Sequence, residues 1–144
     1  MGFFDNKTVT LFNRSLNAET EEEKYYPTLL ECVDLVETRG ANISKSGMDH
    51  ADAAKLYIDF SVFKRIKKTY IEPKSWESLS EIEKHKHITF TPATDFFVNG
   101  DQTGINLPNE NAFEWMYDNF DGVYKITNVD RYEDILPHFE IGGV

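Results

Sequence analysis

Residues 55–60 read KLYIDF, and their alternation decides the fold class. Leu56, Ile58 and Phe60 share one side of an extended chain, and polar or amphipathic residues occupy the other side. A period of two residues is typical of a β-strand with one buried face. This segment is therefore predicted to be a strand, and it sets the pattern to look for elsewhere.

The same alternation recurs along the chain. In residues 7–13, Val9 and Leu11 alternate with threonines, and this predicts a strand with one face buried. Further strands are predicted at residues 28–38, 88–91, 95–98, 123–129 and 138–141. The segment 28–38 mixes apolar and acidic positions, so we expect it to bend or to carry a β-bulge, with Cys32 packed inside.

Three polar segments separate these strands. Residues 17–24 are rich in glutamate and have no apolar face, which predicts a solvated connection. Residues 39–52 are small, polar and glycine-containing, which predicts a long loop. Between residues 60 and 88 the strand pattern stops, and residues 61–75 are expected to form a second loop.

Two short helices are expected. Residues 75–84 look helical, and Ser78 and Glu81 have capping-box spacing. Residues 109–120 are the clearer case, with box-like spacing between Asn111 and Glu114. An aromatic stripe at helical spacing is predicted to cover the sheet. It consists of Phe113, Met116, Tyr117 and Phe120.

The 144 residues are enough for one domain with one core, so residues 1–144 are taken as a single unit. Short strands with few helices predict a mostly β fold, a small β-barrel or sandwich-like domain with long loops. The formal charge of -10 opposes non-specific binding to DNA or to anionic lipid. We found no secretion signal and no apolar stretch long enough to span a membrane, so no membrane association is expected.

No catalytic constellation is recognisable. The sequence lacks a G-x-S-x-G elbow, a glycine-rich phosphate loop and a D-x-[DN]-x-[DN]-G calcium loop. His85, His87 and His138 are the right residue type for a three-histidine metal site, but nothing in the sequence brings them together. The remaining aspartates are interpreted as an acidic surface. We therefore expect a protein that is not an enzyme and has no metal or cofactor.

One basic cluster stands out in this acidic chain. Four of the fifteen Lys and Arg residues fall within five positions. They are Lys64, Arg65, Lys67 and Lys68. Such a cluster is a candidate docking patch for an acidic partner, including a neighbouring copy of the same chain, and the alternative is a solvated loop.

Read end to end, the chain resembles the head-completion proteins of tailed bacteriophages, the head-closure, stopper or minor capsid group. The resemblance is carried by the segments VTLFNR (9–14), YPTLL (26–30), KSG (45–47) before LYI (56–58), YIEP (70–73) before Trp76, TDFFV (94–98) before Gly100, and VDR (129–131) through PHFEIGG (137–143). The ending is the most distinctive part. The helix at residues 109–120 departs from the compact members of the group.

The resemblance implies a structural virion protein of the phage neck, the head–tail connector, made in the bacterial cytoplasm. Identical subunits would form a ring beneath the portal that closes the DNA-filled head and offers the tail its attachment surface. Expected partners are the portal or adaptor proteins, the tail proteins, and passing genomic DNA that is not bound sequence-specifically. Residues 39–53 or residues 61–75 would supply the lumen or docking loops, and the sequence does not tell which of the two faces the channel. The candidate residues are Arg39, Asn42, Lys45 and Ser46, together with the basic cluster.

Other readings stay open at this point. The runner-up in the same class is a tail-completion or tail-terminator subunit. A small-ligand-binding β-barrel is a second possibility, because Trp76, Trp115 and the Phe-rich strands could line a cavity. The third is an enzyme with a histidine-centred site.

Overall fold

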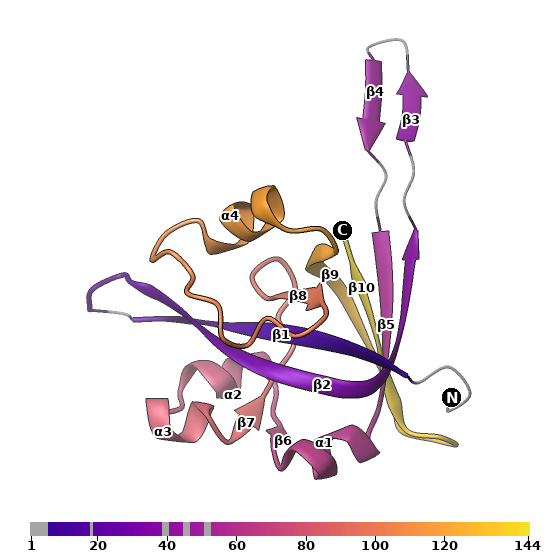
Figure 1. The fold of residues 1–144 in the computed structure, drawn as a ribbon. Coiled ribbons are helices and arrows are strands. Elements are labelled where there is room, and N and C mark those ends of the chain that lie inside the picture. Colours follow the sequence, from indigo (N-terminus) through magenta and orange to yellow (C-terminus); the bar gives the residue numbers. More distant parts are fainter. Residues whose placement is uncertain (1–5, 18, 39–40, 45–46, 51–52) are drawn as a thin grey trace.

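Six antiparallel strands close into a barrel in the computed structural model, which describes residues 6–17, 19–38, 41–44, 47–50 and 53–144 (Figure 1). Around the barrel the strand order is β1-β2-β5-β10-β9-β8. The strands are β1 (Lys7–Leu16), β2 (Glu23–Thr38), β5 (Ala53–Asp59), β8 (Phe96–Asn99), β9 (Val123–Tyr132) and β10 (His138–Gly143). The predicted mostly β, barrel-like fold is confirmed.

The long strand β2 serves two neighbours. Its first part pairs with β1, and residues 34–38 pair with β5. Between these parts Lys7 faces Val33 and Thr8 faces Glu31, so Cys32 has no partner on β1. Cys32 also has a φ of 60°, in the left-handed region. The predicted bulge is confirmed, but the expected packing of Cys32 is wrong: the bulge leaves its side chain exposed.

Strand β1 is buried on both faces, against the prediction of one. Val9 and Leu11 face the main core, while Thr10 and Phe12 on the other side are also inaccessible to solvent. The reason is a second, smaller core outside the barrel wall. It contains Phe12, Phe96, Val98, Met116 and Val123.

Helix α4 (Ala112–Asn119) lies over this second core, as the expected helix should. Met116 is fully buried, and Phe113 and Phe120 are partly buried against the same cluster. The prediction is wrong for Tyr117, the remaining residue of the stripe, which is 49% exposed. The helix has eight residues, and its buried side chains are Ala112 in the first turn and Met116 one turn later.

The predicted cap of α4 is also wrong. Asn111 has a left-handed φ of 54° and its side chain makes no capping hydrogen bond. Asparagine tolerates this conformation better than most residues, so it turns the chain into the helix instead of capping it.

Three short helices and a parallel pair of two-residue strands cover the other end of the barrel. They are α1 (Ser61–Ile66), β6 (Thr69–Tyr70), α2 (Pro73–Glu77), α3 (Glu81–Lys84) and β7 (His87–Ile88). The prediction of a loop at residues 61–75 is therefore wrong, because α1, β6 and the start of α2 occupy this segment. The single helix expected at residues 75–84 is split in two, and the cap of α3 is Ser80, whose hydroxyl accepts from the Glu83 N–H.

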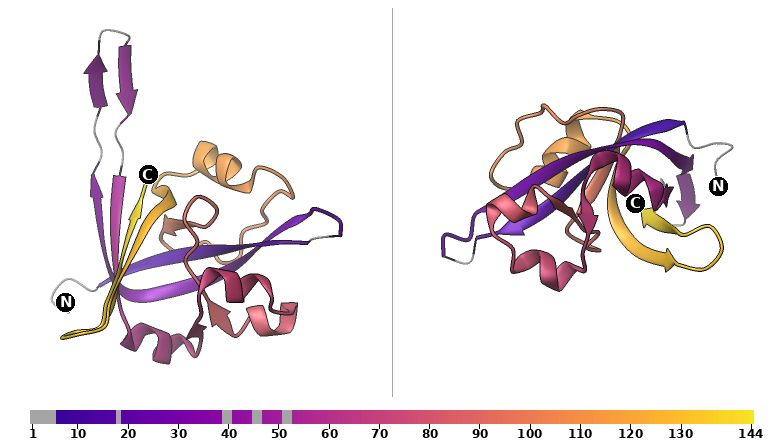
Figure 2. Two further views of the ribbon diagram at one scale, coloured as in Figure 1. Left: turned by 180° about the vertical axis from the view of Figure 1, so that it is seen from behind. Right: turned by 90° about the horizontal axis from the view of Figure 1, so that it is seen from below.

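The loop expected at residues 39–52 contains two paired strands, β3 (Ala41–Ser44) and β4 (Gly47–His50). They prolong the line of β2 and β5 well beyond the barrel (Figures 1 and 2). The acidic connection at residues 17–24 is as predicted up to Glu22. There the side-chain oxygen of Asn17 accepts from the Glu19 and Thr20 N–H groups, and β2 begins at Glu23.

Candidate docking surface

The basic cluster lies on α1 and just after it. The helix begins where the Ser61 N–H donates to Asp59 Oδ1 at 2.8 Å, and it is anchored by the buried side chains of Val62 and Phe63. It ends at Lys67, whose left-handed φ of 58° lets its N–H donate to the Phe63 carbonyl. Basic residues in the last turn also interact favourably with the helix dipole.

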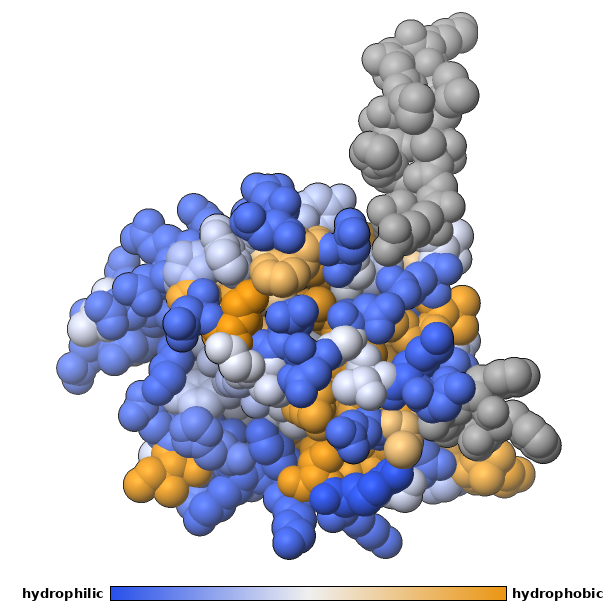
Figure 3. All heavy atoms as spheres, viewed as in Figure 1, coloured by the Kyte–Doolittle hydropathy of each residue, from blue (hydrophilic) through white to orange (hydrophobic). Residues whose placement is uncertain are grey.

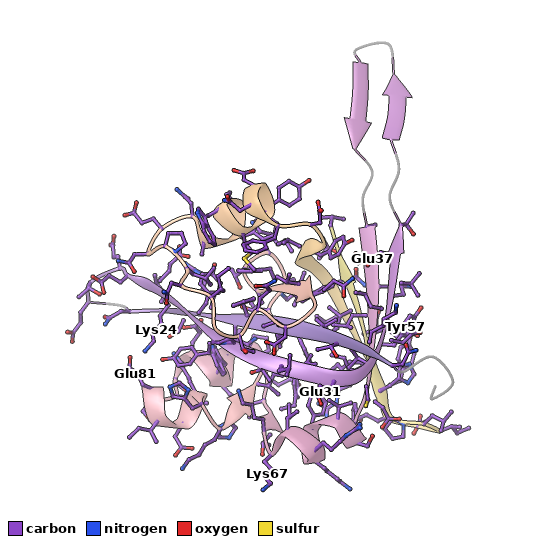
Figure 4. All side chains as sticks on the ribbon, viewed as in Figure 1. Lys24, Glu31, Glu37, Tyr57, Lys67 and Glu81 are labelled. Carbon is purple, nitrogen blue, oxygen red and sulfur yellow. The ribbon has the colours of Figure 1, made fainter. Side chains whose placement is uncertain are left out.

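These cations lack neutralising partners in the part of the chain that the structure describes. Lys64, Arg65 and Lys67 are exposed, and Lys67 extends outward below the barrel in Figure 4. Lys68 is half-buried and donates to Thr28 Oγ1 at 2.6 Å, and burial lowers its pKa. No ion pair among the described residues involves any of the four. In a chain of net charge -10, this is a local excess of positive charge.

An aromatic depression adjoins the basic cluster. Phe60, Phe63 and Tyr70 form its apolar wall, with Lys64 and Lys67 among the other lining residues, and its open volume is about 500 Å³. Tyr70 stacks on Phe90 with ring centroids 5.7 Å apart, so the wall is continuous with the core. Burial raises the pKa of Tyr70 to about 12, so its hydroxyl stays protonated. We call these lining residues and the basic cluster together the basic–aromatic surface.

Arg131, from β9, borders this surface. Its guanidinium lies 5.5 Å from the Phe60 ring centroid and 5.3 Å from that of Tyr70. It also forms ion pairs with Glu72 at 3.4 Å and Glu133 at 3.1 Å. The cation therefore covers one side of the aromatic wall and compensates the nearest carboxylates.

The structure gathers only part of the predicted site. Lys64, Arg65, Lys67 and Lys68 come together, whereas Asn42 lies in β3, opposite Asp49 of β4. Arg39, Lys45 and Ser46 lie outside the described residues. The aromatic wall was missed because residues 61–75 were expected to form a loop, whereas Phe60 and Phe63 belong to the start of α1 and Tyr70 to β6.

The three histidines do not form a metal site. His85 packs edge-on against Tyr26, His87 contacts the Glu83 carbonyl, and His138 stacks on Tyr132. Within the described residues, no group of three or more His, Cys, Asp or Glu side chains is placed to hold a metal ion.

Asp95 is the exception to the acidic-surface interpretation, because it is completely buried. Its carboxylate accepts hydrogen bonds from the Arg14 N–H, the Thr91 N–H and Asn13 Nδ2, each at 2.9 Å. Burial nevertheless raises the pKa of Asp95 to about 6. The network ties β1 to the turn before β8, and its role is structural.

The tryptophans do not line an internal cavity. Trp76 is buried against Tyr26 and donates to the Arg14 carbonyl at 2.9 Å, while Trp115 lies partly exposed on α4. The barrel interior is filled by apolar side chains such as Leu56, Ile58 and Phe97. The aromatic-lined cavity that suggested a small-ligand-binding β-barrel is therefore not found among the described residues.

These observations define a small closed β-barrel protein with a projecting two-stranded arm and a basic–aromatic surface at one end. The chain belongs to a family of unknown function, DUF6751, whose model matches residues 4–144. No curated protein and no solved structure matches it significantly. Among the described residues, no helix is long and apolar enough to cross a membrane.

Proposed function

We propose that the protein is a structural subunit of the bacteriophage neck, where identical copies form a ring beneath the portal that closes the filled head and receives the tail. The observation that carries the proposal is the arm formed by β3 and β4, which stands out from a closed barrel. The resemblance of the sequence to head-completion proteins supports the same reading.

A closed barrel suits a ring subunit. Each of its six strands pairs with two neighbours, so no strand is left at the edge of the sheet. Side chains and connections are then the main contact surfaces that the barrel offers to neighbouring copies. This favours a defined ring over open-ended strand addition.

The arm suits a lumen segment. Its two strands pair with each other from Ala41 with His50 to Ser44 with Gly47, so their hydrogen bonds do not depend on the barrel. An isolated two-stranded hairpin is only marginally stable in water. Contacts with neighbouring arms in a ring would therefore stabilise it, and the arms would together narrow the channel.

The charge distribution fits both tasks. A net charge of -10 repels DNA, so a ring of such subunits would let the genome pass without gripping it. The basic–aromatic surface, by contrast, would attract an acidic partner and orient it before apolar contact is made.

The decisive experiment measures the mass of the purified chain alone and mixed with the portal and tail proteins of the same genome. We expect the chain to bind the portal complex as a ring of several copies. Binding to tail tubes and not to portal complexes would assign it to tail completion instead. A chain that ignores both partners would reject the neck proposal.

A matched pair of variants extends this test. Lys64→Glu with Lys67→Glu reverses charge on the basic–aromatic surface, and Lys74→Glu with Lys86→Glu makes the same change on exposed lysines of the α2–β7 region. We expect the first pair to weaken ring assembly on the portal and the second to leave it unchanged.

A further inference from the structure

The end of the β9–β10 hairpin exposes two large apolar side chains. Ile135 is 92% exposed and Leu136 is 60% exposed, in the connection between Tyr132 and His138. The hairpin end extends away from the barrel in Figure 1, and Figure 3 shows hydrophobic surface at the same end of the molecule. Neighbouring exposed aliphatic residues on a projecting tip are typical of a contact site.

The backbone of this tip is unusual as well. Ile135 and Leu136 have φ values of 25° and 59°, a region that L-residues other than Asn, Asp and Gly rarely adopt. In free solution Asn or Gly would suit these positions better. Burial of these two side chains against another surface would offset the free-energy cost of their backbone conformation.

The chemistry of the tip specifies its partner. Asp134 is exposed beside the two aliphatic side chains and forms no ion pair among the described residues, whereas the exposed Glu133 pairs with Arg131 at 3.1 Å. The tip is therefore apolar with one acidic side chain that a partner can compensate. A complementary partner must offer an apolar hollow rimmed by positive charge. The basic–aromatic surface of this same chain has that combination, with Phe63 and Tyr70 as the wall and Lys64 and Lys67 on the rim.

The hairpin does not fill the depression of its own copy. Arg131, one residue before β9 ends, lies over the Phe60 and Tyr70 rings, and the connection then leads away from the surface. The tip side chains stay exposed, and the depression stays open. One copy thus carries an unused tip and an unused depression.

We propose that the β9–β10 tip of one copy docks into the basic–aromatic depression of the next. Such a head-to-tail contact uses different surfaces on the two copies, so it repeats around a ring when the rotation closes. The inference rests on the proposed function for its biological setting, since it names the contact that would join the ring subunits.

The test uses the full-length chain and sedimentation over a concentration series. Ile135→Asn with Leu136→Asn removes the apolar tip while suiting its positive φ values. Lys64→Glu with Lys67→Glu reverses the rim of the depression. The controls are Ile82→Asn, at a 70% exposed residue on α3, and Lys74→Glu with Lys86→Glu, which changes the net charge as much as the rim variant does.

We expect the mass of the native chain to rise with concentration, each double variant to stay monomeric, and the controls to behave like the native chain. A mixture of the two double variants should form dimers and nothing larger. Each mixed pair retains only one intact tip facing one intact depression. Circular dichroism establishes that every variant is folded.

A native chain that stays monomeric throughout, or double variants that associate as the native chain does, would overturn this contact. Portal binding is measured separately, so the two proposals can fail independently. Loss of self-association in the variants of a chain that ignores the portal would retain the contact and reject the neck role. If both double variants still form rings on the portal, the neck role is retained and the proposed contact is rejected.

Discussion

The two ends of the stretch from Ile135 to Ile141 use apolar residues in opposite ways. In β10, Phe139 and Ile141 are 1% and 0% exposed and fill the barrel, whereas Ile135 and Leu136, a few positions earlier, project into solvent. Apolar character alone thus does not tell whether a residue stabilises the fold or is available for association. The difference lies in where the residues are placed. Substitution in β10 should change the stability of the fold, and substitution at the tip should change self-association.

The largest loss of stability is expected in the barrel. The Phe139 ring lies within 6 Å of the ring centroids of Phe60, Phe63, Tyr70 and Phe90. Phe139→Ala should lower the free energy of unfolding by roughly 3–5 kcal/mol, because it removes buried surface and leaves a cavity. Urea unfolding measures this. A loss below about 1 kcal/mol would mean that the interior is not packed as described.

A pH-dependent loss is expected from Asp95, the one carboxylate that is buried among the residues that the structure describes. Its pKa is about 6 in the folded chain, against about 3.9 for an unperturbed aspartate. The folded state therefore binds the proton more tightly, so this contribution to stability is complete below pH 4 and declines as the pH rises to 6. The decline is roughly 3 kcal/mol.

Asp95→Asn is the control for this prediction, because it keeps a side chain of the same shape and cannot ionise. Unfolding at a series of pH values should show the decline in the native chain and a smaller one in the variant. Identical pH profiles for the two proteins would contradict it.

A smaller effect is expected at Gly143, where β10 passes close to the interior aromatics. A Cβ at this position would lie 2.9 Å from the Tyr124 Cβ and 3.0 Å from the Phe97 ring. Gly143→Ala should therefore cost about 1–3 kcal/mol through overpacking. Gly104→Ala is the matched control, because a Cβ there meets nothing within 4 Å. Thermal unfolding of both variants should separate them.

The smallest effect on stability is expected at the hairpin tip. Ile135→Asn with Leu136→Asn should change the free energy of unfolding of the monomer by no more than about 0.5 kcal/mol, since both side chains are exposed. Urea unfolding at low concentration measures this. A large loss would show that the tip stabilises the monomer, and the proposed contact would lose its basis.

The strands could be predicted because alternation reports directly on a half-buried sheet. Residues 55–60 and 138–141 fall inside β5 and β10, or within one residue of their ends. The alternation could not reveal that Thr10 and Phe12 are buried as well, because the residues that cover them lie about a hundred positions later. Local periodicity carries no information about such a second layer.

Helix ends and loops were predicted less well, for local reasons. The 75–84 segment contains several serines that could cap a helix. Ser80 is the cap of α3 because its backbone is extended there and its side chain accepts from the Glu83 N–H. Residues 39–52 have no apolar pattern, yet β3 and β4 pair because β2 and β5 deliver their ends side by side. The sequence of residues 39–52 does not show that the ends of β2 and β5 lie side by side.

The basic half of the candidate surface was visible in advance, and the aromatic half was not. Lys64, Arg65 and Lys67 are neighbours in the chain, so their charges add in any fold that exposes them. Phe60, Phe63 and Tyr70 form a wall only because α1 and β6 turn back over Phe139. Charge density is a local property, but the position of these rings depends on Phe139 of β10, which is distant in the sequence.

The sequence by itself determined the mostly β class, the bulge in β2, the amphipathic helix at α4 and the basic cluster. These features depend on periodicity or on charges close together along the chain. Only the tertiary structure decided the closure of the barrel by β1 and β8, the burial of Asp95 and the exposure of the β9–β10 tip. Each of these depends on which distant segments meet, and that is settled by the packing of the whole chain.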